Sequence, residues 1–173
     1  MSQDYVLPAQ CGIAHVHLKV SDLGAAIGFY RDVLGFELTA RFGDETAFLA
    51  AGGYHHHVAL NTWDSRGGRP APREATGLHH FAIRYPDRHA LAVALRRVMD
   101  AGVRIRGASD HGVGESVYLA DPDGNGVELT VDRPREAWIR EADGSIAMTT
   151  ARFDLRQLLE EAALPSTGVP ERS

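Results

Sequence analysis

An internal repeat constrains the fold of this chain more than any other feature. The stretch GIAHVHLKVSDLGAAIGFYRDVLGF, which begins at residue 12, is repeated in outline by GLHHFAIRYPDRHALAVALRRVMDAGV, which begins at residue 77. His15 corresponds to His80, and Asp22 corresponds to Asp87 at the same offset. Two copies of one unit within 173 residues indicate paired modules that share a core, because a lone unit of this size buries little surface.

The first module, residues 12–63, is predicted to be a βαβββ unit. Apolar and polar side chains alternate over residues 13–20, which indicates a strand with one apolar face. Ser21 or Asp22 then caps a helix with an apolar stripe at helical spacing, and Gly35 ends that helix. Three further β-prone runs lie near residues 36–42, 45–51 and 55–62.

The second module, residues 78–132, repeats this order after a linker, residues 64–77, that is rich in glycine, proline and charge. Its expected elements are a strand at 79–85, a helix at 88–101 and strands near 103–107, 115–120 and 126–131. We expect each module to curl its sheet and to cover the convex face with its helix. The two concave faces would then pair around a cleft.

A C-terminal extension, residues 133–165, breaks the repeat and is expected to wrap around the modules. It contains a short amphipathic helix, residues 154–163, and it could either roof the cleft or cover a subunit interface. Residues 166–173 are expected to be disordered. The prediction is one α+β domain, with two paired βαβββ modules whose curled mixed sheets enclose the cleft.

Charge and composition exclude several classes of partner. The net charge is −5 and the arginines are dispersed among acidic residues, so we expect no nucleic-acid partner. No apolar run approaches the roughly 20 residues that span a bilayer, and no secretory signal is evident, so we expect no membrane association. A single cysteine, Cys11, cannot form an internal disulfide. These features favour a cytoplasmic protein with a small-molecule partner.

Strand alternation predicts three metal-binding side chains in the cleft. Phe81 and Ile83 should pack under the second helix, which turns His80 toward the concave face. The same argument turns His15 inward, and the apolar neighbours of Glu128 turn that carboxylate inward as well. Two imidazoles and one carboxylate form a facial set that suits Fe(II), with Mn(II) as the competing ion. Such a set makes this a metal-binding cleft with open positions for a substrate and O2.

The first module lacks the carboxylate that would complete a four-ligand site. When HVALN, residues 57–61, is aligned with GVELT, residues 126–130, Ala59 falls opposite Glu128. A metal site with three protein ligands has more open positions than one with four. It therefore favours a function in which the substrate binds the metal through two oxygens, and it disfavours an isomerase with a closed coordination shell.

Both modules together, about residues 12–132, resemble the vicinal oxygen chelate (glyoxalase/bleomycin resistance/dioxygenase) superfamily. Within them, DHGVGESVYLADPDGNGVE resembles the signature of extradiol ring-cleavage dioxygenases. The matching residues are His111, Val117, Tyr118, Asp121, Pro122 and Glu128. Ser109 departs from the pattern, since the family usually has Gly, Asn, Thr, Ile or Val there. YHHHVALNTW, residues 54–63, and the tail resemble one two-module half of bacterial catechol-2,3-dioxygenases.

This resemblance implies extradiol (meta) cleavage of an aromatic diol by O2 at a non-haem Fe(II), with no organic cofactor. It implies that His56 is the active-site base, and that Tyr118 and His111 contact the substrate. Strict strand alternation instead points His57 into the cleft, unless a bulge or a strand end precedes Val58. His57 therefore remains the substitute for His56.

Two other functions remain open at this point. A metal-dependent lyase, isomerase or thiol transferase of the same superfamily would act without O2. A non-catalytic small-molecule-binding protein of the resistance type would hold no metal. In each case the exposed sheet edges and the tail favour a homodimer or higher homo-oligomer.

Overall fold

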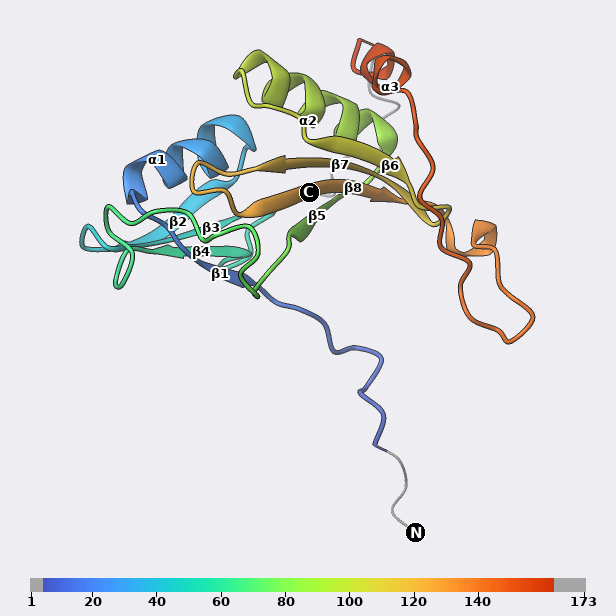
Figure 1. The fold of residues 1–173 in the computed structure, drawn as a ribbon, viewed down its shortest axis with the longest axis horizontal. Helices are drawn as coiled ribbons and strands as arrows, with labels where there is room; N and C mark the ends of the chain where they lie inside the picture. Colours follow the sequence, from blue (N-terminus) through green and yellow to red (C-terminus); the bar gives the residue numbers. More distant parts are fainter. Residues whose placement is uncertain (1–4, 164–173) are drawn as a thin grey trace.

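The computed structural model describes residues 5–163, and the segment predicted to be disordered, residues 166–173, lies outside the described residues. Strands form two four-stranded sheets, and the helices lie on one side of both sheets (Figure 1). In each sheet the first strand of a module runs parallel to the last, and the other pairs are antiparallel. The predicted α+β architecture of two βαβββ modules is confirmed.

The first sheet contains β1 (Val16–Lys19), β2 (Glu37–Phe42), β3 (Thr46–Ala50) and β4 (Val58–Asn61), in the order β1-β4-β3-β2. The carboxylate of Asp22 caps α1 (Leu23–Ile27) by accepting a hydrogen bond from the Ala25 backbone amide at 2.9 Å. The chain then continues into η1 (Gly28–Val33), where the turn widens to a π-helix and the Leu34 amide bonds to the Phe29 carbonyl. An uninterrupted helix was predicted here.

The second sheet contains β5 (Phe81–Tyr85), β6 (Gly107–Asp110), β7 (Gly114–Ala120) and β8 (Gly126–Asp132), in the order β5-β8-β7-β6. Asp87 caps α2 (Arg88–Asp100) as Asp22 caps α1, through a 2.7 Å bond from the Ala90 amide. The predicted strand at 103–107 is displaced toward the C-terminus. Val103 still bonds back to the end of the helix, and pairing with β7 starts only with the Arg106 amide.

The C-terminal extension docks on the second module. It contains the 3-10 helix η2 (Arg135–Ala137) and α3 (Leu155–Glu161), and α3 lies beside α2 (Figure 1). Leu158 of α3 is fully buried, and Glu161 forms a 2.8 Å ion pair with Arg88 at the start of α2. A hydrophobic anchor and an ion pair therefore hold the end of the described chain against the second module.

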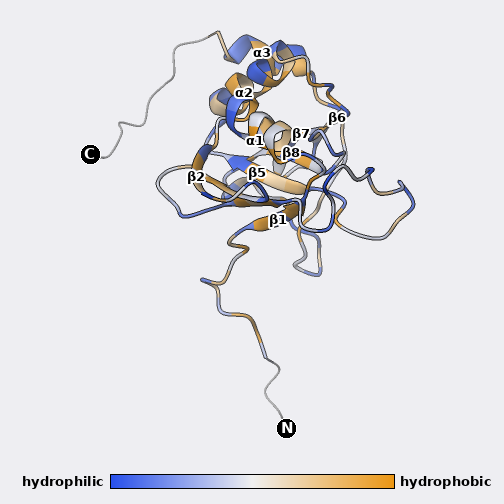
Figure 2. Ribbon diagram, turned by 90° about the vertical axis from the view of Figure 1, so that its left-hand side faces the viewer, coloured by the Kyte–Doolittle hydropathy of each residue, from blue (hydrophilic) through white to orange (hydrophobic). Residues whose placement is uncertain are grey.

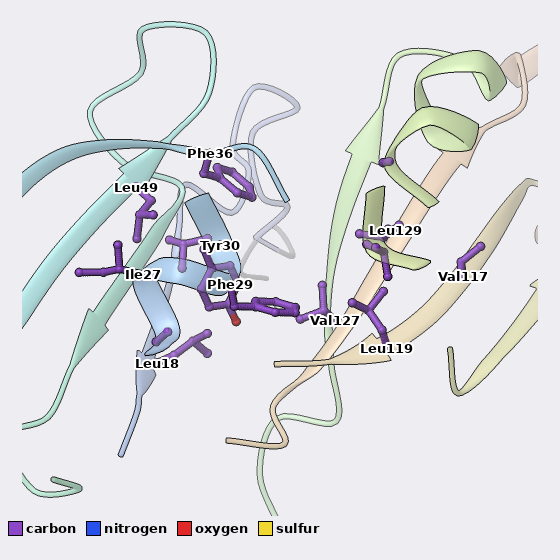
Figure 3. Packing of buried hydrophobic residues seen from close by; sticks show 14 of the residues in the cluster. Leu18, Ile27, Phe29, Tyr30, Phe36, Leu49, Val117, Leu119, Val127 and Leu129 are labelled. Atoms are coloured by element: carbon purple, nitrogen blue, oxygen red, sulfur yellow. The ribbon is translucent and has the colours of Figure 1, made fainter. Parts of the chain in front are cut away.

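A single cluster of buried side chains draws on both modules. Phe29 and Tyr30 of η1 lie between the first sheet and Val127 of the second sheet (Figure 3). The Tyr30 hydroxyl donates a buried hydrogen bond of 3.0 Å to Asp121, in the turn before β8. Nearby, the Ser21 amide donates to Asp123 at 3.0 Å. These bonds fix how the first module sits on the turn that precedes Glu128.

The N-terminal arm leaves the body of the molecule, and Figure 2 shows it extending away from both sheets. Tyr5 and Ile13 on this arm are 84% and 92% exposed. Among the helices of residues 5–163, none is long and apolar enough to cross a membrane.

Candidate active site

One face of the second sheet collects the polar side chains, and its other face is apolar. Val127, Leu129 and Val131 are buried toward α2, so Glu128 and Thr130 point the opposite way. The register places Tyr118 opposite Glu128 and Ser116 opposite Thr130. Because these pairs alternate with buried apolar residues, they share the face away from the helix. His80 lies on this face two residues before Ala82, which pairs with Glu128.

Glu128 and His80 form a close ionisable pair on this face. The Nε2 atom of His80 lies 2.8 Å from Oε2 of Glu128, whose side chain is 12% exposed. The other carboxylate oxygen, Oε1, accepts a hydrogen bond from the hydroxyl of Ser116. A carboxylate with so little access to water requires donors or a cation around it, and here both oxygens have a partner.

The second ring nitrogen of His80 is also engaged. Its Nδ1 atom lies 2.8 Å from Nδ1 of His79, so one ring donates and the other accepts. Metal-binding histidines in proteins usually donate the remote N–H to a fixed acceptor, which sets the ring orientation and the tautomer, and Nδ1 of His79 can be that acceptor here. The contact leaves Nε2 of His80 directed at Glu128.

The spacing of His80 and Glu128 fits two neighbouring ligands of one ion. Two ligand atoms at right angles, each about 2.1 Å from an octahedral ion, are about 3 Å apart. The observed 2.8 Å is the length of a direct hydrogen bond and is also compatible with this geometry, and imidazole with carboxylate is a donor set that Fe(II) and Mn(II) accept. The pair therefore fits two corners of the predicted three-residue set.

The third predicted ligand, His15, is not gathered with this pair. Its ring packs on His56 of the first module, with 4.5 Å between the ring centroids. Within residues 5–163, no three His, Cys, Asp or Glu side chains are grouped closely enough to hold a metal. The structure thus brings together His80 and Glu128, and His15 remains a predicted ligand at the equivalent position before β1.

His56, rather than His57, lies beside His15. The ring of His56 also contacts Phe48 at 5.0 Å, and its Nδ1 is 2.7 Å from Nδ1 of His55. Desolvation, followed by the neighbouring His15, lowers the pKa of His56. His57 is exposed, and its Nδ1 accepts a hydrogen bond from the Ala51 amide. β4 begins only at Val58, so the strand alternation that predicts an inward His57 does not extend to this residue, and the choice of His56 as the base stays a prediction.

Tyr118 and His111 form a hydrogen-bonded pair next to His80. The hydroxyl of Tyr118 lies 2.7 Å from Nε2 of His111, and the Tyr118 ring is 5.5 Å from that of His80. Nδ1 of His111 donates to the Thr149 carbonyl at 2.8 Å, since a carbonyl only accepts. Neutral His111 therefore accepts the Tyr118 proton at Nε2. Desolvation and the charge of Glu128 raise the pKa of Tyr118, which keeps it a donor at neutral pH.

The C-terminal extension holds His111 in place, which the sequence did not indicate. The Thr149 amide donates to the His111 carbonyl at 3.0 Å, and Ala151 bridges to Asp110. The Arg133 guanidinium donates two hydrogen bonds of 2.7 Å each to the Asp110 carboxylate. The loop that carries His111 is thus fixed by the strand end of β8 on one side and by the extension on the other.

A family model described as the Glyoxalase/Bleomycin resistance protein/Dioxygenase superfamily matches residues 12–129. The chain belongs to this superfamily. A solved lactoylglutathione lyase from Agrobacterium tumefaciens has 25% sequence identity and a TM-score of 0.56, and the match covers 72% of this chain and 96% of that one. A solved glyoxalase/dioxygenase from Nostoc punctiforme, at 19% identity and a TM-score of 0.59, has the same fold; the match covers 78% of this chain and 100% of that one.

Relatives within the superfamily differ in chemistry. A catechol-2,3-dioxygenase of Bacillus subtilis (strain 168) is 42% identical over 150 residues, which are 87% of this chain and 52% of that protein. A biphenyl-2,3-diol 1,2-dioxygenase 3 of Rhodococcus globerulus is 37% identical over 69% of this chain and 63% of that protein. A glutathione transferase FosA of Serratia marcescens is 34% identical, over 68% of this chain and 78% of that protein. The chain therefore spans about half to two thirds of the length of the two dioxygenases.

Ser116 is a polar residue of this site that sequence analysis did not select. It is 1% exposed, and it is bonded to both Glu128 and Thr130. Its position two residues before Tyr118 places it on the polar face by strand alternation alone. Residues with hydroxyl groups are common in strands, however, so only the register with β8 shows that Glu128 is the partner of Ser116.

Proposed function

We propose that this chain acts as an extradiol ring-cleavage dioxygenase, which inserts O2 into a catecholic substrate at a non-haem Fe(II) held by His15, His80 and Glu128. The observation that supports this most is the grouping of the His80 and Glu128 pair with Tyr118 and His111 on one sheet face. Two relatives that are named as dioxygenases of aromatic diols support the same reaction class.

The chain's own residues would divide the proton chemistry. When bound, the ion would lower the pKa of the coordinated diol hydroxyls and offer further open positions. His56, whose lowered pKa keeps it neutral at pH 7, would accept a proton from the substrate. Tyr118 would donate a hydrogen bond to a substrate oxygen. That bond uses the single Tyr118 proton, which would turn from Nε2 of His111 to the substrate oxygen, while the Thr149 carbonyl keeps the His111 ring in place.

Oxygen uptake with a panel of diols tests this function. The protein is loaded anaerobically with Fe(II), exposed to air and supplied with catechol, 3-methylcatechol or biphenyl-2,3-diol. We expect O2 consumption together with a yellow ring-cleavage product, and we expect Glu128→Gln to abolish both. Protein that contains iron but consumes no O2 with any diol would contradict the proposal.

The glutathione transferase relative supports a second candidate, because that protein is matched over 78% of its length. A thiol transferase on this scaffold would join a thiol to an electrophilic substrate with a divalent metal and without O2. The same preparation, assayed anaerobically with glutathione and an epoxide, distinguishes the two reactions. Loss of free thiol under argon would favour the transferase.

A further inference from the structure

We infer that Ser116 is a positioning residue that holds the Glu128 carboxylate so that Oε2 faces His80 and the metal position. This inference rests on the proposed function, since it concerns a predicted ligand of the same site. Oε1 of Glu128 accepts the Ser116 hydroxyl, whereas Oε2 lies 2.8 Å from Nε2 of His80. The two oxygens of one carboxylate therefore have separate partners on opposite sides.

The number of hydroxyl protons on the polar face indicates that Ser116 is the donor in its bond to Glu128. Thr130 has one hydroxyl proton, and its Oγ1 lies 3.1 Å from the Glu115 carbonyl and 3.0 Å from Oγ of Ser116. Whichever of these accepts the Thr130 proton, the Ser116 proton is best placed on the charged oxygen of Glu128. Hydrogen bonds to a charged acceptor are roughly twice as strong as those between neutral groups.

The backbone makes Ser116 a rigid support. Ser116 lies in β7 between β6 and β8, pairs with Thr130 and is 1% exposed. Its hydroxyl reaches Glu128 from the neighbouring register position with a single rotatable bond. Removal of the hydroxyl would leave Oε1 buried without that donor and would free the carboxylate to rotate. Loss of such a support for a metal ligand typically weakens metal affinity 10- to 100-fold.

Calorimetric titration of the metal-free full chain with Co(II) tests the inference without any turnover. We expect Ser116→Ala to bind Co(II) about 10- to 100-fold more weakly than the parent. Ser116→Thr keeps the hydroxyl and should restore most of the affinity. Ser109→Ala is the matched control. Ser109 lies in β6, pairs with Ser116 of β7 and is not among the described partners of Glu128.

The outcomes separate this inference from the proposed function. If the parent chain binds Co(II) and Ser116→Ala binds it within about threefold, the inference is wrong and the proposed function stands. If the parent binds no Co(II), the proposed function fails and the inference fails with it. Thermal unfolding of the metal-free variants provides the last readout. Ser116→Ala could lose as much free energy of unfolding without metal as it loses in free energy of Co(II) binding, with no recovery in Ser116→Thr. That result would assign Ser116 a packing role instead.

Discussion

At the scale of single residues, the histidines of this chain are distinguished by what their second nitrogen contacts. His111 has Nδ1 on the Thr149 carbonyl, and His80 has Nδ1 on His79. Each contact leaves Nε2 directed at a partner on the polar face, Tyr118 or Glu128. His56 differs, since its ring packs between His15 and Phe48. A ring that is partly desolvated and has no carboxylate among its described contacts is suited to accept a proton.

Substitution of this histidine gives the prediction at the residue scale. We expect His56→Gln to lower kcat about 10²- to 10⁴-fold, which is the usual contribution of a general base. Co(II) affinity should stay within a few-fold of the parent, because His56 is not a predicted ligand. His57→Gln should keep most of the activity, since His57 is exposed and bonded to the Ala51 amide. The reverse result, with only His57→Gln inactive, would transfer the role to His57.

At the scale of elements, the loop between β6 and β7 depends on an ion pair that bridges two strands. Arg133, just after β8, donates two hydrogen bonds of 2.7 Å to Asp110 and another to the Gly112 carbonyl at 3.0 Å. These bonds close the loop around His111. The hydrogen bonds from Arg133, followed by the Gly112 amide, hold the pKa of Asp110 below its ordinary value of 3.8. The pair therefore contributes stability above that pH and loses it as pH falls through the lowered value.

We expect Arg133→Met to reduce the free energy of unfolding by about 1–2 kcal/mol at pH 7, a modest figure because the arginine is about one third exposed. Urea unfolding at pH 7 and at an acidic pH below the lowered pKa of Asp110 measures the change, and the difference from the parent should shrink at the acidic pH, where Asp110 is protonated in the folded chain as well. Lys19→Met is the control, since Lys19 pairs with Asp64 at the open surface and should change stability little. An equal loss at both pH values would show that the arginine acts through packing rather than charge.

The elements also show which features a sequence can predict. The caps Asp22 and Asp87, and the order of strands and helices, follow from local patterns that do not depend on the rest of the fold. The position of β6 does not follow from local patterns, because Val103 and Ile105 are β-prone but pack against the core. The π-helical turn of η1 is also not predictable, since apolar spacing cannot distinguish it from an α-helix.

At the scale of the whole molecule, the site also has one part that local sequence patterns predict and another part that depends on how the two modules pack. His80 and Glu128 were predicted to face the same way because a strand has a period of two, and they meet within one sheet. His15 lies in the other module, so its distance from them depends on how the modules dock. That docking involves the bond between Tyr30 and Asp121, which no local pattern predicts.

The bond between Tyr30 and Asp121 gives the prediction at the molecular scale. Tyr30 is fully buried, and burial, with Asp121 beside it, raises the pKa of its phenol far above 10. We expect Tyr30→Phe to reduce the free energy of unfolding at pH 7 by about 1.5–3 kcal/mol, as for a hydrogen bond to a charged acceptor. Unfolding should remain one transition, because both modules share one cluster of buried side chains.

The dependence on alkaline pH checks the mechanism of this effect. A phenol whose folded pKa is raised contributes stability that is present below pH 10 and is lost as pH rises above it, since the unfolded chain then releases the proton. Stability of the parent should therefore fall more steeply above pH 10 than that of Tyr30→Phe. Tyr5→Phe, at an 84% exposed position, should behave as the parent at every pH. A second unfolding transition in Tyr30→Phe would mean instead that the modules are held together mainly by this bond and not by the shared core.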